Sequence, residues 1–151
     1  MTPSAILRIV AAVAALVSGY AHLSLYNDGY KDIPSEFGGI GPIDIGTQFL
    51  LNALGALLIA LGLVLPLFIK SMPDAVWKFS AVMGGVWAAI SLIAFYFAHE
   101  TDGGWFDFTD EPGLKPSPEA ALSVFSEIIV LVSVIALFAL MLRPRRARTE
   151  V

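Results

Sequence analysis

The chain has 151 residues, of which 57% are hydrophobic and only 15% are charged, and its mean hydropathy is +0.77. Soluble domains carry about 45–50% apolar and about 25% charged residues, so this composition excludes an ordinary soluble protein. The chain has no cysteine, which excludes disulfides, thiolate metal sites and thiol catalysis. Its net charge is −4, and its basic cluster is a short C-terminal tail, which argues against nucleic-acid binding.

The apolar residues are concentrated in four blocks. A bilayer core about 30 Å thick needs about 20 apolar residues as a helix, and each block is that long. We therefore predict an all-α integral membrane four-helix bundle that forms a single domain over residues 1–151. The predicted helices cover about residues 5–25, 47–69, 75–99 and 119–142, and a basic tail over 143–151 follows.

The first block contains small residues at every fourth position, at Ala11, Ala15 and Gly19. Such a stripe lets another helix approach closely, so this face is predicted to contact a neighbouring helix. No small-x-small cleavage site follows the block, which argues against a signal peptide.

The second block has Asn52 as its one strongly polar interior residue, and Gly55 shares that face. Pro66 lies in its last turn, where a kink costs little. The third block carries Trp77 and Tyr96 near its two ends, as expected of an interfacial aromatic belt. Pro118 marks the start of the fourth block.

The distribution of lysine and arginine predicts the orientation, because short cytoplasmic loops are enriched in both. Seven of the nine fall on one side of the predicted membrane: Arg8, Lys70, Lys78, Arg143, Arg145, Arg146 and Arg148. Only Lys31 and Lys115 fall on the other side. We expect a multi-pass protein of the cell membrane with both termini in the cytoplasm.

Two acidic loops of about 20 residues each, over 26–46 and 100–118, are then predicted to lie outside the cell. Both loops are rich in aromatic residues, among them Tyr30 and Phe37 in the first and Trp105 in the second. Aromatic residues in such loops indicate a segment folded down on the bundle or lying among the headgroups. A docking surface for a neighbouring protein is the alternative interpretation.

Four polar side chains lie inside the predicted helices, at His22, Asn52, His99 and Glu127. Polar groups in a bilayer are costly, so each calls for a reason. All four fall in the outer leaflet, with Glu127 about one turn, or roughly 6 Å, inside its boundary. Their helical spacing directs them inward, so four antiparallel helices can bring them into one cluster beneath the outer loops.

Three interpretations of this cluster stay open. In the first, the side chains hydrogen-bond one another and only hold the helices together. In the second, they line a pocket for a quinone head or another lipid-borne ligand. The candidate ligand-binding residues are His22, Tyr26, Gln48, Asn52, His99 and Glu127. In the third, His22 and His99 hold a b-type haem, and a metal site formed with Glu127 is a weaker variant.

A family resemblance rests on two stretches, "GYAHLSLYNDGYKDIP" from Gly19 and "IGTQFLLNALGALLIALGL" from Ile45. They resemble small four-helix membrane proteins of high-GC Gram-positive bacteria, broadly similar to the DoxX-like group. The resemblance covers about residues 18–63 and implies importance for His22, Tyr26 and Asn52. Some DoxX-like proteins are implied in quinone-linked oxidoreductase complexes, but no catalytic residue can be carried over to this chain.

The sequence shows no Gly-rich phosphate loop, nucleophile elbow or His-Glu-x-x-His pair. We therefore expect a non-enzymatic accessory or scaffold protein of a cell-envelope or respiratory assembly, with other membrane proteins or further copies of itself as partners. The alternative is a quinone- or haem-binding redox component with a polar site under the outer loops.

The predicted topology can be tested with reporter fusions. A reporter fused after Arg148, or inserted in the 70–74 turn, is expected to report a cytoplasmic position, and one inserted at Gly103 an external position, because of the seven-to-two distribution of basic residues. A cytoplasmic signal from Gly103 would overturn the predicted orientation.

Overall fold

The computed structural model describes residues 1–28, 30–32, 39–40, 43–100 and 118–142. Four long helices make up most of this part: α1 (Pro3–Asn27), α2 (Ile45–Phe68), α3 (Asp74–Glu100) and α4 (Pro118–Leu142). Each is long and apolar enough to cross a membrane. The predicted helical, multi-pass fold is therefore confirmed at this level.

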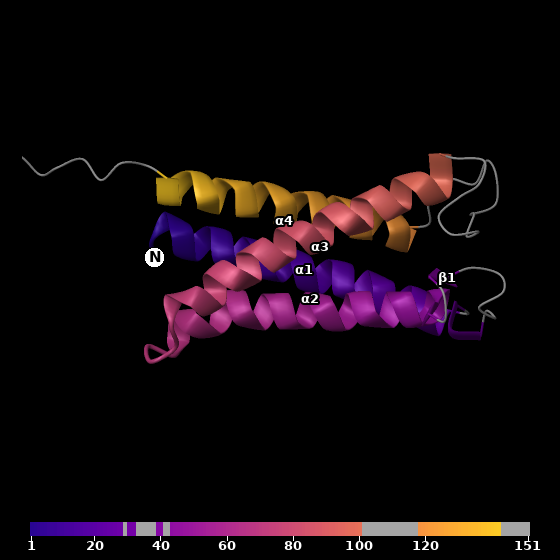
Figure 1. Cartoon of the computed structure of the whole chain (residues 1–151), viewed down its shortest axis with the longest axis horizontal. Helices are drawn as coiled ribbons and strands as arrows, with labels where there is room; N and C mark the ends of the chain where they lie inside the picture. The colour runs from indigo at the N-terminus through magenta and orange to yellow at the C-terminus, as the bar shows by residue number, and fades with distance from the viewer. Residues whose placement is uncertain (29, 33–38, 41–42, 101–117, 143–151) are drawn as a thin grey trace, which may run out of the picture.

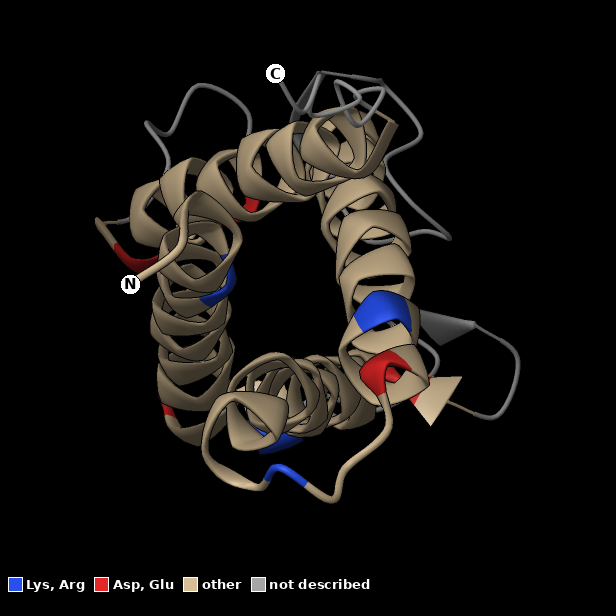
Figure 2. Cartoon of the chain, turned by 90° about the vertical axis from the view of Figure 1, so that its left-hand side faces the viewer, with Lys and Arg blue, Asp and Glu red and all other residues tan. Residues whose placement is uncertain are grey.

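The four helices form an up-and-down bundle (Figures 1 and 2). Helix α1 packs against α2 and α4, and α3 packs against the same two helices from the other side. Helix α3 runs obliquely to the other three (Figure 1). The start of α1, the turn between α2 and α3 and the end of α4 lie at one end of the bundle, as short antiparallel connections require.

Side-chain caps set the helix ends, which differ from the predicted bounds by at most two residues. The Thr2 hydroxyl accepts a hydrogen bond from the Ala5 N–H at 3.2 Å, so α1 begins at Pro3. The Asp44 carboxylate accepts the Thr47 N–H at 2.6 Å and the Thr47 hydroxyl at 2.9 Å, so α2 begins at Ile45. The backbone hydrogen bond from Thr47 also lowers the pKa of Asp44.

The segment between α1 and α2 folds onto the bundle where it is described. It contains the 3₁₀ turn η1 (Tyr30–Asp32) and the short antiparallel strands β1 (Gly39–Ile40) and β2 (Ile43–Asp44). A Cβ atom on Gly46 would lie 2.6 Å from the Tyr30 carbonyl oxygen, so only glycine lets η1 rest on the start of α2. The Tyr30 ring packs edge-on against Phe49 at 4.9 Å. Phe37 and the aromatic residues of the second loop lie outside the described residues.

Small side chains line the contacts between helices, and large apolar ones cover the outside. Ala11 and Ala15 are fully buried, and a Cβ atom on Gly19 would lie 2.8 Å from the Ala56 Cβ. By contrast, Leu58 of α2 and Val132 of α4 are largely exposed. This distribution is typical of membrane helices, whose close contacts depend on small residues while large ones face the lipid.

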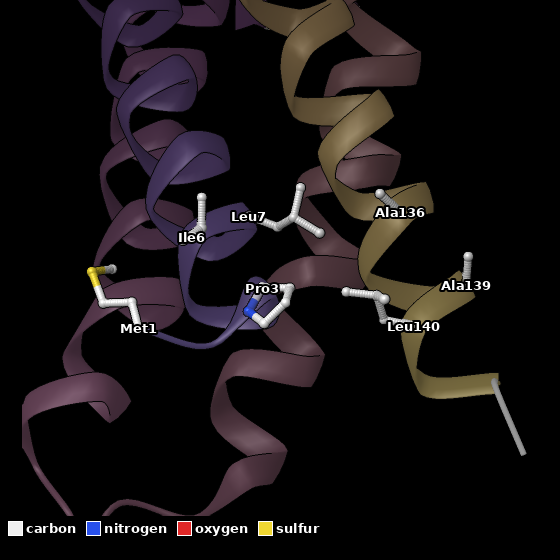
Figure 3. A pocket seen from close by; sticks show the side chains of 7 residues that line it. All are labelled: Met1, Pro3, Ile6, Leu7, Ala136, Ala139 and Leu140. Atoms are coloured by element: carbon white, nitrogen blue, oxygen red, sulfur yellow. The ribbon is translucent and has the colours of Figure 1, made fainter. Parts of the chain in front are cut away.

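An apolar groove of about 490 Å³ opens between the start of α1 and the end of α4 (Figure 3). Its lining is Met1, Pro3, Ile6, Leu7, Ala136, Ala139 and Leu140. It lies at the end of the bundle away from the predicted polar cluster, and its lining suits an acyl chain rather than a polar ligand.

The close contact of α1 with α2 predicts a difference between two substitutions. Gly19→Leu places a side chain where even a Cβ atom would overlap Ala56, so we expect a loss of about 3 kcal/mol or more in the free energy of unfolding. Leu16→Ala trims an exposed side chain whose replacement contact is lipid, so the expected loss is below about 1 kcal/mol. Unfolding of both variants in detergent measures this difference, and equal stability would place the stripe in contact with lipid.

Candidate functional site

Four polar side chains from α1 and α4 meet inside the bundle. Ser18 and His22 lie one turn apart on α1, and Ser123 and Glu127 lie one turn apart on α4. Spacing of four residues puts each pair on one face of its helix, and the two faces oppose each other. All four are buried; Glu127 is 1% exposed and His22 is 7% exposed.

Glu127 is the centre of this cluster, which we call the Glu127 cluster. Its Oε1 atom accepts hydrogen bonds from the hydroxyls of Ser18 and Ser123, both at 2.9 Å. His22 Nε2 lies 3.2 Å from the same oxygen. Two further contacts close the cluster: the Ser18 and Ser123 hydroxyl oxygens are 2.9 Å apart, and the Ser123 hydroxyl lies 3.2 Å from His22 Nε2.

Few hydrogen atoms are available to form hydrogen bonds in these five contacts. Each serine hydroxyl supplies one hydrogen, and one more can reside on either His22 Nε2 or Glu127 Oε1. With one proton on that pair, three contacts at a time contain a hydrogen atom. When Nδ1 carries a hydrogen, moving that proton between Nε2 and Oε1 leaves this number unchanged, so the same hydrogen-bond geometry fits both an ion pair and a neutral pair.

The second ring nitrogen of His22 is buried without a hydrogen-bond partner in the part of the chain that the structure describes. The imidazole packs against the Phe49 ring at 5.5 Å, and Tyr30 covers Phe49 from the loop side. A buried polar atom that lacks a hydrogen-bond partner costs about 1–3 kcal/mol, so one further hydrogen bond to Nδ1 would be favourable.

Asn52 belongs to a different contact. Its Oδ1 atom accepts hydrogen bonds from the Trp87 indole N–H at 2.6 Å and from the Ser91 hydroxyl at 3.4 Å, which join α2 to α3. Gly55, one turn away, lies against the Trp87 ring. The predicted single cluster is thus correct for His22 with Glu127, whereas Asn52 bonds to α3 because its side of α2 faces that helix.

The other predicted residues are spread over the same end of the bundle. Tyr26 is half-buried in the last turn of α1. Gln48 donates a hydrogen bond to the Ile43 carbonyl at 3.3 Å, close to the start of its own helix. The side chain of His99 lies outside the described residues, so the haem hypothesis and the metal hypothesis that need it stay predictions. Within the described residues, no group of three acidic, histidine or cysteine side chains could hold a metal ion.

The prediction overlooked Ser18 and Ser123 as members of the cluster. The signal was their spacing, since each lies four residues before a buried ionisable residue on the same helix. Hydroxyls at such positions supply the hydrogen bonds that a carboxylate inside a membrane requires.

Glu127→Ala tests the contribution of the cluster to stability. It removes the acceptor of three hydrogen bonds at about 1 kcal/mol each, so we expect a loss of about 3 kcal/mol in the free energy of unfolding in detergent. Glu127→Gln keeps an acceptor oxygen and should lose less. Glu119→Ala, at the start of the same helix, serves as the control with an expected change below about 1 kcal/mol. Equal losses for Glu127→Ala and Glu119→Ala would show that the cluster does not hold α1 to α4.

Comparison with family models, with curated proteins and with solved structures finds no match to this chain. The resemblance to DoxX-like proteins therefore stays a prediction from the sequence. The features of the described residues that bear on function are the geometry of the bundle and its buried polar side chains.

Proposed function

We propose that this protein is a non-enzymatic accessory or scaffold component of a cell-envelope or respiratory membrane assembly. The observation that supports this proposal most is that the polar groups inside the bundle form hydrogen bonds between its own helices. Glu127 accepts its hydrogen bonds from side chains of α1 and α4, and Asn52 accepts from α3. These groups join helices to one another, which is the arrangement that a structural component needs.

The outer surface of the bundle suits such a role. Large apolar side chains cover all four helices, so lipid and neighbouring membrane helices are the surroundings that this surface accepts. In the proposed orientation both termini face the cytoplasm and the loops face outward. Partners are other membrane proteins or further copies of the chain.

A second function, a quinone-binding redox component, is favoured by one observation. His22 Nδ1 is buried without a partner among the described residues, and the other ring nitrogen lies 3.2 Å from the carboxyl group of Glu127. A quinone carbonyl could accept a hydrogen bond from Nδ1, and the Glu127 cluster could supply or accept the proton that accompanies electron transfer. Haem ligation through Nε2 fits less well, because it would displace the contacts with Glu127 and Ser123.

Both functions can be tested on one preparation of the full-length chain, tagged and isolated from its native membrane in a mild detergent. An accessory component should migrate on a native gel as a discrete assembly much larger than the 16.2 kDa chain, and should show no Soret band. Migration as the isolated chain, also after cross-linking in intact membranes, would contradict the accessory function.

Organic extraction of the same preparation tests the second function. Quinone recovered in stoichiometric amount from the unsubstituted protein, and lost from His22→Ala, would support it. Leu16→Ala, exposed on the same helix, is the matched control and should retain any bound quinone. Equal quinone content in all three proteins would indicate carry-over of membrane lipid and would remove this candidate.

A further inference from the structure

Arg8 is the second buried ionisable side chain with an unpartnered nitrogen. It lies on α1 at the end of the bundle opposite the Glu127 cluster, and only 7% of its surface is exposed. Its Nε donates a hydrogen bond to the Leu63 carbonyl of α2 at 2.9 Å. Its Nη2 atom is buried and has no hydrogen-bond partner within the described residues.

Two neighbours hold the guanidinium in place. Leu63 lies in the last turns of α2, and its carbonyl accepts the hydrogen bond from Arg8 Nε. On the other side, the guanidinium carbon lies 4.9 Å from the centre of the Trp77 ring of α3. The Arg8 side chain is thus held by α2 and α3, while its buried Nη2 has no hydrogen-bond partner among the described residues.

The charges around Trp77 favour an anion. The ammonium group of Lys78 lies 5.7 Å from the centre of the same ring, so two cations share it. Asp74 is the carboxylate in this group, and it accepts the Trp77 indole N–H at 3.2 Å. Arg8, Lys78 and Asp74 together leave one positive charge uncompensated, part of it buried.

We propose that Arg8 and Lys78, which both lie beside the Trp77 ring, form a binding site for a phosphate group, either the phosphodiester of an anionic lipid or free phosphate. The planar guanidinium presents N–H groups in a fork that matches phosphate oxygens, and Nη2 is the nitrogen that lacks a hydrogen-bond partner among the described residues. Arg8 lies about 8 Å along α1 from its first residue, near one end of the helix. This site is separate from the Glu127 cluster and does not depend on the proposed function.

Binding can be measured on the purified full-length chain after delipidation in a neutral detergent. Phosphatidylglycerol, phosphatidylcholine and inorganic phosphate are each titrated, with thermal unfolding and native mass spectrometry as readouts. We expect phosphatidylglycerol to raise the melting temperature and to be retained, and phosphatidylcholine to do so at least about tenfold more weakly, because its headgroup has no net charge. Stabilisation by inorganic phosphate as well would assign the site to free phosphate; its absence would assign it to the lipid.

Variants locate the site. Lys78→Gln should weaken binding about tenfold, the change expected for losing one charge-assisted contact. Arg8→Lys keeps the charge but not the fork, so it provides a folded comparison should Arg8→Gln fail to fold, and it should also bind more weakly. Lys70→Gln, exposed in the turn at the same end, is the matched control and should bind like the unsubstituted protein.

Two outcomes would overturn the proposal. One is equal stabilisation by phosphatidylglycerol and phosphatidylcholine with no effect of phosphate, which would leave a water molecule as the partner of Nη2. The other is equal weakening by Lys78→Gln and Lys70→Gln, which would indicate nonspecific attraction to the positive end of the bundle.

Discussion

The close approach of α1 to its two neighbours is the constraint on which the rest of the bundle depends. It is possible because the buried faces of α1 carry alanine, serine and glycine; even a methyl group on Gly19 would overlap Ala56. The same closeness on the other side of α1 brings Ser18 and His22 within hydrogen-bonding distance of Glu127. Apolar side chains contact lipid as favourably as they contact each other, so close packing and polar contacts hold the helices together. Small residues on α1 allow both, because they permit close packing and bring the polar side chains within hydrogen-bonding distance.

The two ends of the bundle surround a buried ionisable side chain with different groups, at Glu127 and at Arg8. Near the loops, the carboxyl group of Glu127 is surrounded by two hydroxyls and an imidazole, all within hydrogen-bonding distance of its Oε1 atom. At the other end, the Arg8 guanidinium is held by a carbonyl group and an aromatic ring, neither of which carries a negative charge. Within the described residues, the first arrangement leaves one ring nitrogen without a partner, whereas the second leaves a guanidinium nitrogen without one and two cations beside the single carboxylate of Asp74. This difference is why a phosphate site is proposed at Arg8 and a redox ligand only as a second function at His22.

The interior also shows how polar residues determine which helices are neighbours. Asn52 could have joined the Glu127 cluster by depth alone, yet its amide oxygen faces α3 and is occupied by the Trp87 indole. The interior is therefore divided into an α1–α4 contact and an α2–α3 contact. Each contact pairs one strong acceptor with donors from the facing helix, and the packing of α1 on α2 and of α3 on α4 joins the two pairs.

The sequence alone determined the four long helices and their bounds to within two residues, because bilayer thickness requires about 20 apolar residues in each and the interruptions between the blocks are clear. It also determined that Ala11, Ala15 and Gly19 lie at a helix contact and that Glu127 has a polar partner, because helical periodicity and the cost of a buried charge are local properties. Only the tertiary structure decided which polar groups meet. The rotation of each helix about its axis sends Asn52 to α3, adds Ser18 and Ser123 to Glu127, and directs Arg8 across to Trp77. Those rotations follow from packing among all four helices, which no single segment of the sequence specifies.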